Sequence, residues 1–146
     1  MRIYCCGNSR AVFLVVKIIF GQRLGQRDCI YLRRWCFITK WGSVRLHKWT
    51  YSDDLRHPHD HAWDFWSIVL KGQISDLSDG ELTLRKRWSI NKYSAEHRHS
   101  VVVDKPAWTL LLTGPERRPK WGFWVNGKFR KRNKYFFEYG HHNPCE

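Results

Sequence analysis

The sequence predicts a single all-β domain, built as an antiparallel sandwich or barrel. Its 146 residues are enough for one hydrophobic core and too few for two full-sized domains. Apolar residues make up 42% of the chain and aromatic residues 16%, which excludes a disordered chain and indicates an aromatic-rich interior. From residue 43 onward, short apolar segments with a period of two alternate with turn signals, a pattern typical of antiparallel β-proteins.

The N-terminal segment has a different pattern, and we expect residues 1–30 to form an accessory extension. Within it, residues 11–28 are predicted to be a basic amphipathic helix or an irregular segment. The apolar run at residues 11–20 contains Lys17 and has half of the roughly 20 residues that a membrane-spanning helix needs. It leads into Gln22-Arg23 without a small-residue signal-peptide cleavage site. We therefore predict no membrane span, and leave open a contact with a membrane surface or a partner.

Six segments after residue 43 are predicted strands. Residues 43–50 and 81–88 alternate apolar and polar side chains, as half-buried strands do. Turn signals such as Ser78-Asp79-Gly80 and Asn126-Gly127 lie between the segments, and none after residue 43 has a convincing helical pattern. The predicted strands are residues 43–50, 65–70, 81–88, 101–103, 108–113 and 121–125. We assign the domain to residues 31–137 and a C-terminal tail to residues 138–146.

The cysteines favour a reducing compartment. Their number is odd and their spacing irregular, at Cys5, Cys6, Cys29, Cys36 and Cys145. A secreted domain stapled by disulfides usually carries an even number at regular spacings. The sequence therefore predicts a chain without a disulfide framework, located in the cytoplasm.

The charge favours anionic partners. The formal net charge is +13, and both ends of the chain are more basic than the middle. Such a surface attracts nucleic acid, nucleotides or small acidic molecules. The runs Arg117-Arg118 and residues 128–135 interleave cations with aromatic rings, as surfaces that bind single-stranded nucleic acid do. No zinc-finger cysteine pairs or RNA-binding motif accompany them, so a solvated hairpin is the alternative for residues 128–135.

Two histidine clusters in the nearly neutral middle are the strongest functional signal. His59 and His61, two apart on an extended segment, project to one face and can share a metal ion. The later pair His97 and His99 supplies a third ligand. The alternative is that these histidines are solvated polar residues. Three neutral imidazoles suit Fe(II), Zn, Ni or Cu, with Mn also considered, and leave open positions for water or substrate.

The same residues carry a resemblance to the cupin superfamily. Its two signature motifs are similar to His59-Asp60-His61 with Gly72 after a hydrophobic strand, and to His99 after Tyr93-Ser94-Ala95-Glu96. The chain from about Tyr31 to Phe137 resembles small RmlC-like cupin proteins of bacteria and their phages. The shared segments are Tyr31-Leu32-Arg33-Arg34-Trp35, residues 59–65, Ala95-Glu96, residues 108–115 and Trp121-Gly122-Phe123. The resemblance implies a double-stranded β-helix, or jelly roll, that holds a metal on His59, His61 and His99.

The sequence departs from the cupin motifs at two places. The glutamate ligand of the first motif is replaced by Phe65 and Trp66, while Asp64 would face away from the histidines unless its strand bulges. The resulting three-histidine set is similar to that of the thiol dioxygenases, which use ferrous iron. Ser94-Ala95-Glu96 replaces the Pro-x-Gly of the second motif, so the choice of His99 over His97 follows from the resemblance alone.

The remaining candidates would surround the metal. Arg45, Arg85 and Arg87 are candidate anion-binding residues, with a solvated strand face as the alternative for each. Trp63 is a candidate pocket wall, and His47 either a fourth polar group of the site or a hydrogen-bonded core histidine. His141-His142 in the tail forms a surface segment or a lid.

Together these features predict a metal-dependent oxygenase of the Fe(II) type, acting on a small anionic substrate. A homodimer is compatible with them. The alternative is a non-catalytic basic module that binds nucleotide or nucleic acid.

Overall fold

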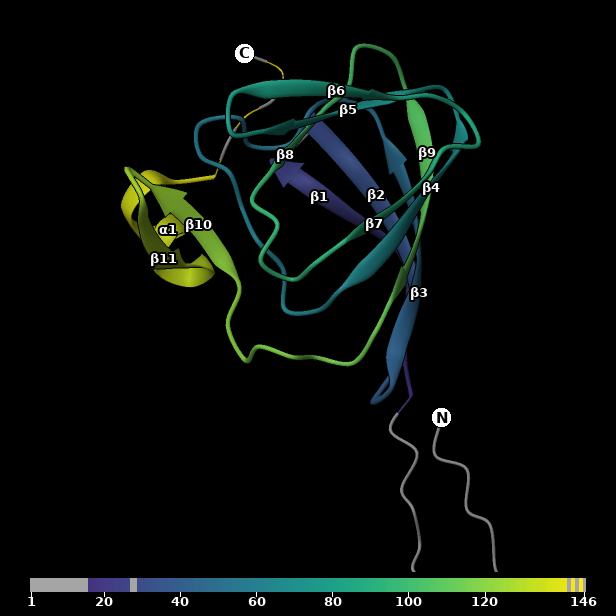
Figure 1. Cartoon of the computed structure of the whole chain (residues 1–146), viewed down its shortest axis with the longest axis horizontal. Helices are drawn as coiled ribbons and strands as arrows, with labels where there is room; N and C mark the ends of the chain where they lie inside the picture. The colour runs from purple at the N-terminus through teal and green to yellow at the C-terminus, as the bar shows by residue number, and fades with distance from the viewer. Residues whose placement is uncertain (1–15, 27–28, 142, 144, 146) are drawn as a thin grey trace, which may run out of the picture.

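The computed structural model describes residues 16–26, 29–141, 143 and 145. Within these residues the chain forms eleven β-strands and one short helix (Figure 1). The all-β prediction is therefore confirmed. Each strand that the sequence predicted after residue 43 is present, with its ends shifted by up to three residues.

The larger sheet has six antiparallel strands. Their order is β1 (Lys17–Gln26), β2 (Cys29–Thr39), β3 (Gly42–Trp49), β9 (Ala107–Thr113), β4 (Phe65–Lys71) and β7 (Ile90–Tyr93). Consecutive chain segments form the β1–β2–β3 meander, and β9 then inserts between β3 and β4. This crossing of distant segments is typical of a jelly roll.

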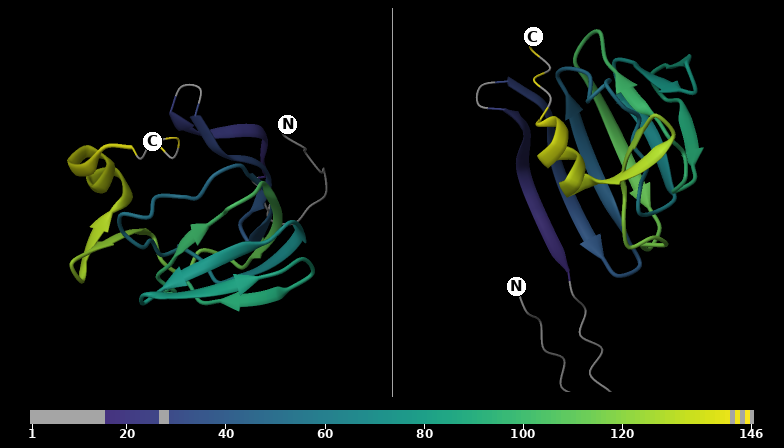
Figure 2. Two further views of the ribbon diagram at one scale, coloured as in Figure 1. Left: turned by 90° about the horizontal axis from the view of Figure 1, so that it is seen from above. Right: turned by 90° about the vertical axis from the view of Figure 1, so that its left-hand side faces the viewer.

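A second sheet covers one face of the first. It contains β6 (Glu81–Arg85), β5 (Ile74–Ser78) and β8 (Ser100–Val102) in that order, and Figures 1 and 2 show it as a separate layer. The hydrophobic core lies between the layers. Its buried residues are Leu32, Trp49, Val69, Ile74, Val101, Val103 and Ala107. Their burial stabilises the sandwich by about 25 cal/mol for each Å² of apolar surface removed from water.

A small unit lies beside the sandwich. It consists of the hairpin β10 (Gly122–Val125) and β11 (Lys128–Lys131), followed by helix α1 (Arg132–Tyr139) (Figure 1). The hairpin turn is Asn126-Gly127, where both residues have positive φ, as the predicted Asn-Gly turn requires. The Phe123 ring stacks on Tyr135 with centroids 3.8 Å apart, so the unit has a core of its own.

Two secondary-structure predictions are wrong. Residues 17–26 form strand β1, not a helix, because they pair with β2 along its length. Of the remaining residues in the predicted segment, 11–15 and 27–28 lie outside the described residues. Gly21 and Gly25 adopt positive φ at irregularities in this strand, which hide its period. The sequence also predicted no helix after residue 43, yet α1 forms at residues 132–139.

The structure also corrects the cysteine prediction. Cys29, at the start of β2, forms a disulfide with Cys145 in the C-terminal tail. The free cysteine among the described residues is Cys36, which is buried; Cys5 and Cys6 lie outside them. The assignment of residues 1–30, 31–137 and 138–146 to separate parts stays a prediction. In the described part of the chain, no helix is long and apolar enough to cross a membrane.

Candidate metal centre

The three predicted histidine ligands meet at one end of the sandwich. His59 and His61 lie in the long connection between β3 and β4, and His99 directly precedes β8. The backbone N–H of His59 donates to the carbonyl of His99 at 2.9 Å, and the N–H of His99 donates back at 3.0 Å. This isolated antiparallel bridge, flanked by a second bridge from His59 to Phe123, fixes the two histidine segments side by side.

The geometry of the three imidazoles fits one metal ion. One ring nitrogen from each of His59, His61 and His99 lies within 4.8 Å of the others, and Nε2 of His61 is 2.9 Å from Nε2 of His99. Nitrogens bound to one ion at about 2.0–2.1 Å stand roughly 3 Å apart. Modest side-chain rotations would bring His59 to the same distance.

Asp76 on β5 holds two of the histidines from behind. Its Oδ1 lies 2.5 Å from Nδ1 of His99, and its Oδ2 lies 3.0 Å from Nε2 of His97. A carboxylate that accepts the Nδ1–H of a histidine leaves Nε2 free for a metal and makes it more basic. This arrangement leaves Nε2 of His99 available to a metal ion. His97 forms a second candidate group with Asp76 and His99, displaced toward the carboxylate.

Burial sets the protonation states that metal binding needs. Desolvation and the neighbouring imidazoles lower the pKa of His59 to about 3, and the same causes lower the pKa of His61. Burial alone would raise the pKa of Asp76, but its hydrogen bonds with His97 and His99 lower it instead. Neutral imidazoles beside a charged carboxylate are the forms that bind a divalent cation.

A second carboxylate lies behind His59. Asp53 is buried, and its Oδ2 is 3.6 Å from Nδ1 of His59, while its Oδ1 accepts the backbone N–H of Val101 at 2.9 Å. Burial raises the pKa of Asp53. A bound cation nearby would offset the cost of ionising this carboxyl group.

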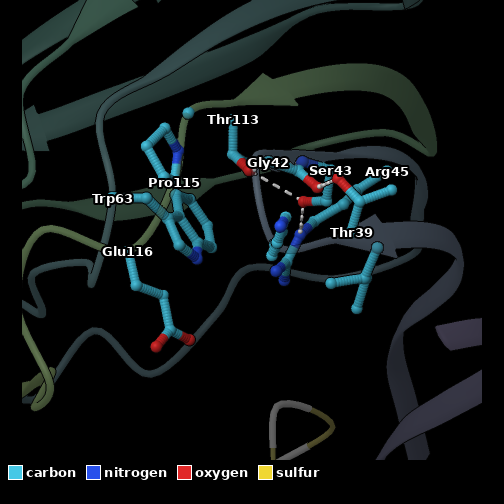
Figure 3. A pocket seen from close by; sticks show the side chains of 11 residues that line it. Thr39, Gly42, Ser43, Arg45, Trp63, Thr113, Pro115 and Glu116 are labelled. Atoms are coloured by element: carbon cyan, nitrogen blue, oxygen red, sulfur yellow. Dashed lines mark hydrogen bonds between the residues drawn. The ribbon is translucent and has the colours of Figure 1, made fainter. Parts of the chain in front are cut away.

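Trp63 connects the histidines to a pocket. Its ring stacks on His61 with centroids 4.9 Å apart, and the Arg45 guanidinium lies 4.5 Å from the Trp63 ring. Both side chains line a cavity of about 290 Å³ (Figure 3). Its other lining residues are Ile38, Thr39, Lys40, Gly42, Ser43, Thr113, Gly114, Pro115 and Glu116. Trp63, the predicted pocket wall, and Arg45, a predicted anion-binding residue, thus line the same cavity.

Arg45 is preorganised in that pocket. Its Nε donates to Ser43 Oγ at 2.8 Å, and Figure 3 shows this contact together with the bond between Ser43 and Thr113. Burial lowers the pKa of Arg45. A half-buried guanidinium with donors left over favours a carboxylate or phosphate as its partner.

Other predicted residues lie away from the ligand atoms. Asp64 accepts bonds from the Arg117 guanidinium at 2.6 and 2.7 Å and from the Ala95 N–H, so it belongs to neither candidate ligand group of the described residues. Arg87 is exposed; its Nε donates to the Leu70 carbonyl. The Arg85 guanidinium lies beside Tyr93, whose ring contacts His97 and His99.

His47 is a core histidine without the predicted hydrogen bond. It is buried on the inner face of β3, and neither ring nitrogen has a hydrogen-bond partner among the described residues. Desolvation, together with the charges of Arg34 and Arg45, lowers its pKa to about 3. His47 is part of neither candidate ligand group in the described chain.

Three acidic residues of the site were missed at the sequence level. They are Asp53, Asp76 and Asp60, the middle residue of the His-Asp-His motif. Asp60 is fully buried and accepts bonds from Gly122 N, Arg118 Nη1 and Trp124 Nε1. It thereby fixes β10 against the histidine loop. Its position between two ligands was a signal; nothing in the sequence marked Asp53 or Asp76.

Comparison with known proteins finds similarity in structure alone. No protein-family model and no curated protein matches the chain. An RmlC-like cupin from Shewanella frigidimarina is 15% identical, with a TM-score of 0.53 over 71% of this chain and 95% of that one. The DMSP lyase DddQ from Ruegeria pomeroyi is 16% identical, with a TM-score of 0.54 over 73% and 59%. The Fe(II) form of HppE is 16% identical, with a TM-score of 0.51 over 72% and 62%.

These matches agree with the all-β, two-sheet architecture of the described residues. The chain has the jelly-roll fold of the RmlC-like cupins, as its motifs predicted.

Proposed function

We propose that this protein is a metal-dependent enzyme that binds Fe(II) through His59, His61 and His99 and acts on a small anionic substrate. One observation carries the proposal: the ring nitrogens of three histidines converge, and one of the three, His99, is oriented by a buried carboxylate, Asp76. Most histidine metal ligands donate their other ring N–H to such a carboxylate, to a carbonyl or to water. A cluster of solvated histidines would not need one.

The donor set is compatible with several metals, and the similar structures favour iron. Imidazole suits Fe, Zn, Cu and Ni, and a structure of similar fold is the Fe(II) form of HppE. When bound, Fe(II) would supply open coordination positions for dioxygen and for a chelating substrate. Three neutral ligands leave the full charge of the ion uncompensated, which favours an anionic chelator.

The residues of the chain would bind and orient that substrate. Arg45 would pair with its carboxylate or phosphate group, while Trp63, which contacts both Arg45 and His61, would lie against the part of the substrate that reaches the metal. Asp76 would keep the proton on Nδ1 of His99. Tyr93 and Phe65, stacked with centroids 5.0 Å apart, would exclude water from the inner side of the site.

Metal analysis tests the proposal. Untagged protein should bind one equivalent of Fe(II) or Zn(II), and the His59→Ala, His61→Ala, His99→Ala triple variant should bind none. His97→Ala is the matched control, because it removes a histidine of the same cluster that we do not assign as a ligand. Equal metal content in the wild type and the triple variant would refute the site.

A basic binding module is the second candidate. The observation that favours it is the group of exposed cations on β11 and α1, which includes Lys128, Lys131, Arg132 and Lys134. These residues lie beside aromatic rings; the Arg132 guanidinium, for example, is 5.5 Å from the Trp121 ring. Nucleotide or nucleic acid would bind there without using the histidine centre.

A further inference from the structure

An unusual apolar surface lies on the outer face of the six-stranded sheet, on the side away from the core. Five exposed side chains occupy one cross-strand row. They are Ile18 on β1, Phe37 on β2, Val44 on β3, Leu112 on β9 and Trp66 on β4, each paired in register with the next. Their exposed fractions range from 39 to 69%. The row crosses five neighbouring strands, a distance of roughly 19 Å at the usual strand spacing.

A second row extends this surface. It contains the half-buried residues Trp35, Leu46, Leu110 and Ile68, and ends at the exposed Ile90. We call the two rows together the outer apolar face. Isolated exposed apolar residues are common on monomers, but a contiguous patch of this kind marks an interaction site.

We infer that the outer apolar face binds a second copy of this chain, related by a two-fold axis near Val44. Val44 is the central residue of the first row. A two-fold axis at this position therefore places the row of one chain directly opposite the same row of the other chain. Two flat sheet faces then pack about 10 Å apart with interdigitating side chains. An isologous contact of this type is the commonest form of homo-oligomer.

The size of the face agrees with a stable dimer. The five residues of the first row and Ile90 expose on the order of 500 Å² of side chain, given that large aromatic residues bury about 150–250 Å² each. The second row and the aliphatic parts of the surrounding side chains raise this exposed area toward the roughly 800 Å² that each partner contributes to a standard interface.

The charge around the face predicts how the dimer responds to salt. The six strands of the sheet contain no Asp or Glu, whereas Arg33, Lys48 and Lys92 border the apolar rows. Two copies of a chain with a net charge of +13 repel one another. Because salt screens this repulsion, the dimer should become tighter as salt is raised.

Sedimentation velocity of the full chain at micromolar concentrations tests the inference. The wild type should sediment with twice the chain mass of 17.7 kDa. Val44→Glu, which places a charge at the centre of the face, should weaken the dimer by at least about tenfold, as truncation of a central interface residue does. Leu82→Glu is the matched control, because Leu82 is also an exposed apolar residue but lies on β6 in the other sheet; it should leave the dimer unchanged.

A milder variant guards against a folding defect. Val44→Thr keeps the β-branched shape that the strand favours and should still weaken the dimer, with an unchanged circular dichroism spectrum. A wild-type monomer at all concentrations, or a dimer insensitive to both Val44 substitutions, would overturn the inference. Two other outcomes would also overturn the inference. In the first, the full chain is a monomer and dimerises only after residues 1–15 are removed. In the second, the monomer binds phosphatidylserine vesicles, and Val44→Glu abolishes this binding. None of these outcomes depends on whether the histidines bind metal.

Discussion

At the scale of single residues, the proposed metal centre depends on Asp76 as much as on the three histidines. Nε2 of His99 can face a metal because Nδ1 is committed to this carboxylate, 2.5 Å away. The same carboxylate holds His97 and so keeps a competing imidazole outside the trio. One buried acid thus distinguishes between two histidines that lie on the same face of an extended segment.

Asp76→Asn should therefore weaken metal binding by about 10–100-fold, the usual effect of losing a carboxylate that accepts the N–H of a histidine ligand. The amide keeps the volume and one acceptor but loses the negative charge. Competition titration with a chelator measures the affinity for Zn(II) or Fe(II). Asp79→Asn, an equally isosteric change in the exposed turn after β5, should have no effect. Unchanged affinity in the Asp76 variant, with the fold intact, would refute the orienting role.

His47 should make the protein sensitive to acid. Its pKa in the folded state is about 3, below the ordinary value of about 6.5, so the unfolded chain takes up a proton that the folded chain does not. Above about pH 6.5 the protonation of His47 does not lower the free energy of unfolding. As the pH falls from about 6.5 toward 3, it lowers the free energy of unfolding by up to about 1.4 kcal/mol per pH unit.

Replacing His47 by leucine should remove this part of the pH dependence. Urea unfolding at several pH values between 7 and 4 measures the free energy of unfolding of both proteins. His47→Leu should lose less stability on acidification than the wild type, because no buried base remains to protonate on unfolding. At neutral pH the change should be small, since the ring nitrogens of His47 have no hydrogen-bond partners to lose among the described residues. Parallel pH curves for the two proteins would contradict the prediction.

At the scale of elements, polar contacts attach the β10–β11–α1 unit to the sandwich. The Tyr135 hydroxyl donates to Asp54 Oδ2 at 3.1 Å and lies 3.0 Å from Nδ1 of His57. Arg56 binds Asp54 and the carbonyl of Tyr139 at the end of α1. These residues follow β3 and precede the histidine motif, so the same loop carries two of the proposed metal ligands and holds the helix.

Tyr135→Phe should loosen that attachment. The ring can still stack on Phe123, but the buried Asp54 loses a donor, at a cost of about 1–3 kcal/mol. Hydrogen exchange should accelerate in α1 and β10 more than in β3 or β9. Phe137→Ala is the control, because Phe137 lies on the same helix and is 92% exposed. Uniform acceleration across both sheets would show that the unit is not separately anchored.

The sequence predicted elements that alternate or that form short apolar runs, and it missed elements in which function or irregularity breaks these patterns. β3 was found because its side chains alternate, and β9 because it is a short apolar run between turn signals. β5 was missed because Ser75 and Asp76 are buried, so that polar residues face inward where they serve the site. β1 was missed because its glycines and register shifts interrupt the pattern.

The site was predicted as far as its residues are close in sequence or belong to a family motif. The spacing of His59 and His61 indicated a shared face, and the resemblance added His99. Asp53, Asp76 and the Cys29–Cys145 disulfide depend on long-range pairing, such as that between β5 and β8. Nothing in the spacing of these residues encodes that pairing.

At the scale of the whole molecule, charge and apolar surface predict opposite responses to salt. The outer apolar face should associate more tightly in salt, because screening reduces the repulsion between basic chains. Binding of a polyanion should become weaker, because each phosphate contact releases counterions that added salt drives back. Salt dependence therefore separates two kinds of association that a single affinity measurement would not distinguish.

The nucleic-acid alternative can be decided by this difference. If β11 and α1 bind duplex DNA, the logarithm of the affinity should fall with the logarithm of salt concentration by about 0.9 for each phosphate contacted. Replacing Lys128 and Lys131 by glutamine should reduce the slope by about 1.8, since two contacts are lost. Fluorescence anisotropy with a labelled duplex measures the slope, and metal content should be the same in both proteins. Lys105→Gln, an exposed cation in the turn before β9, should leave the slope unchanged. Binding that is undetectable or independent of salt would rule out the nucleic-acid alternative. The proposed metal centre and its anion pocket would then remain as the functional site.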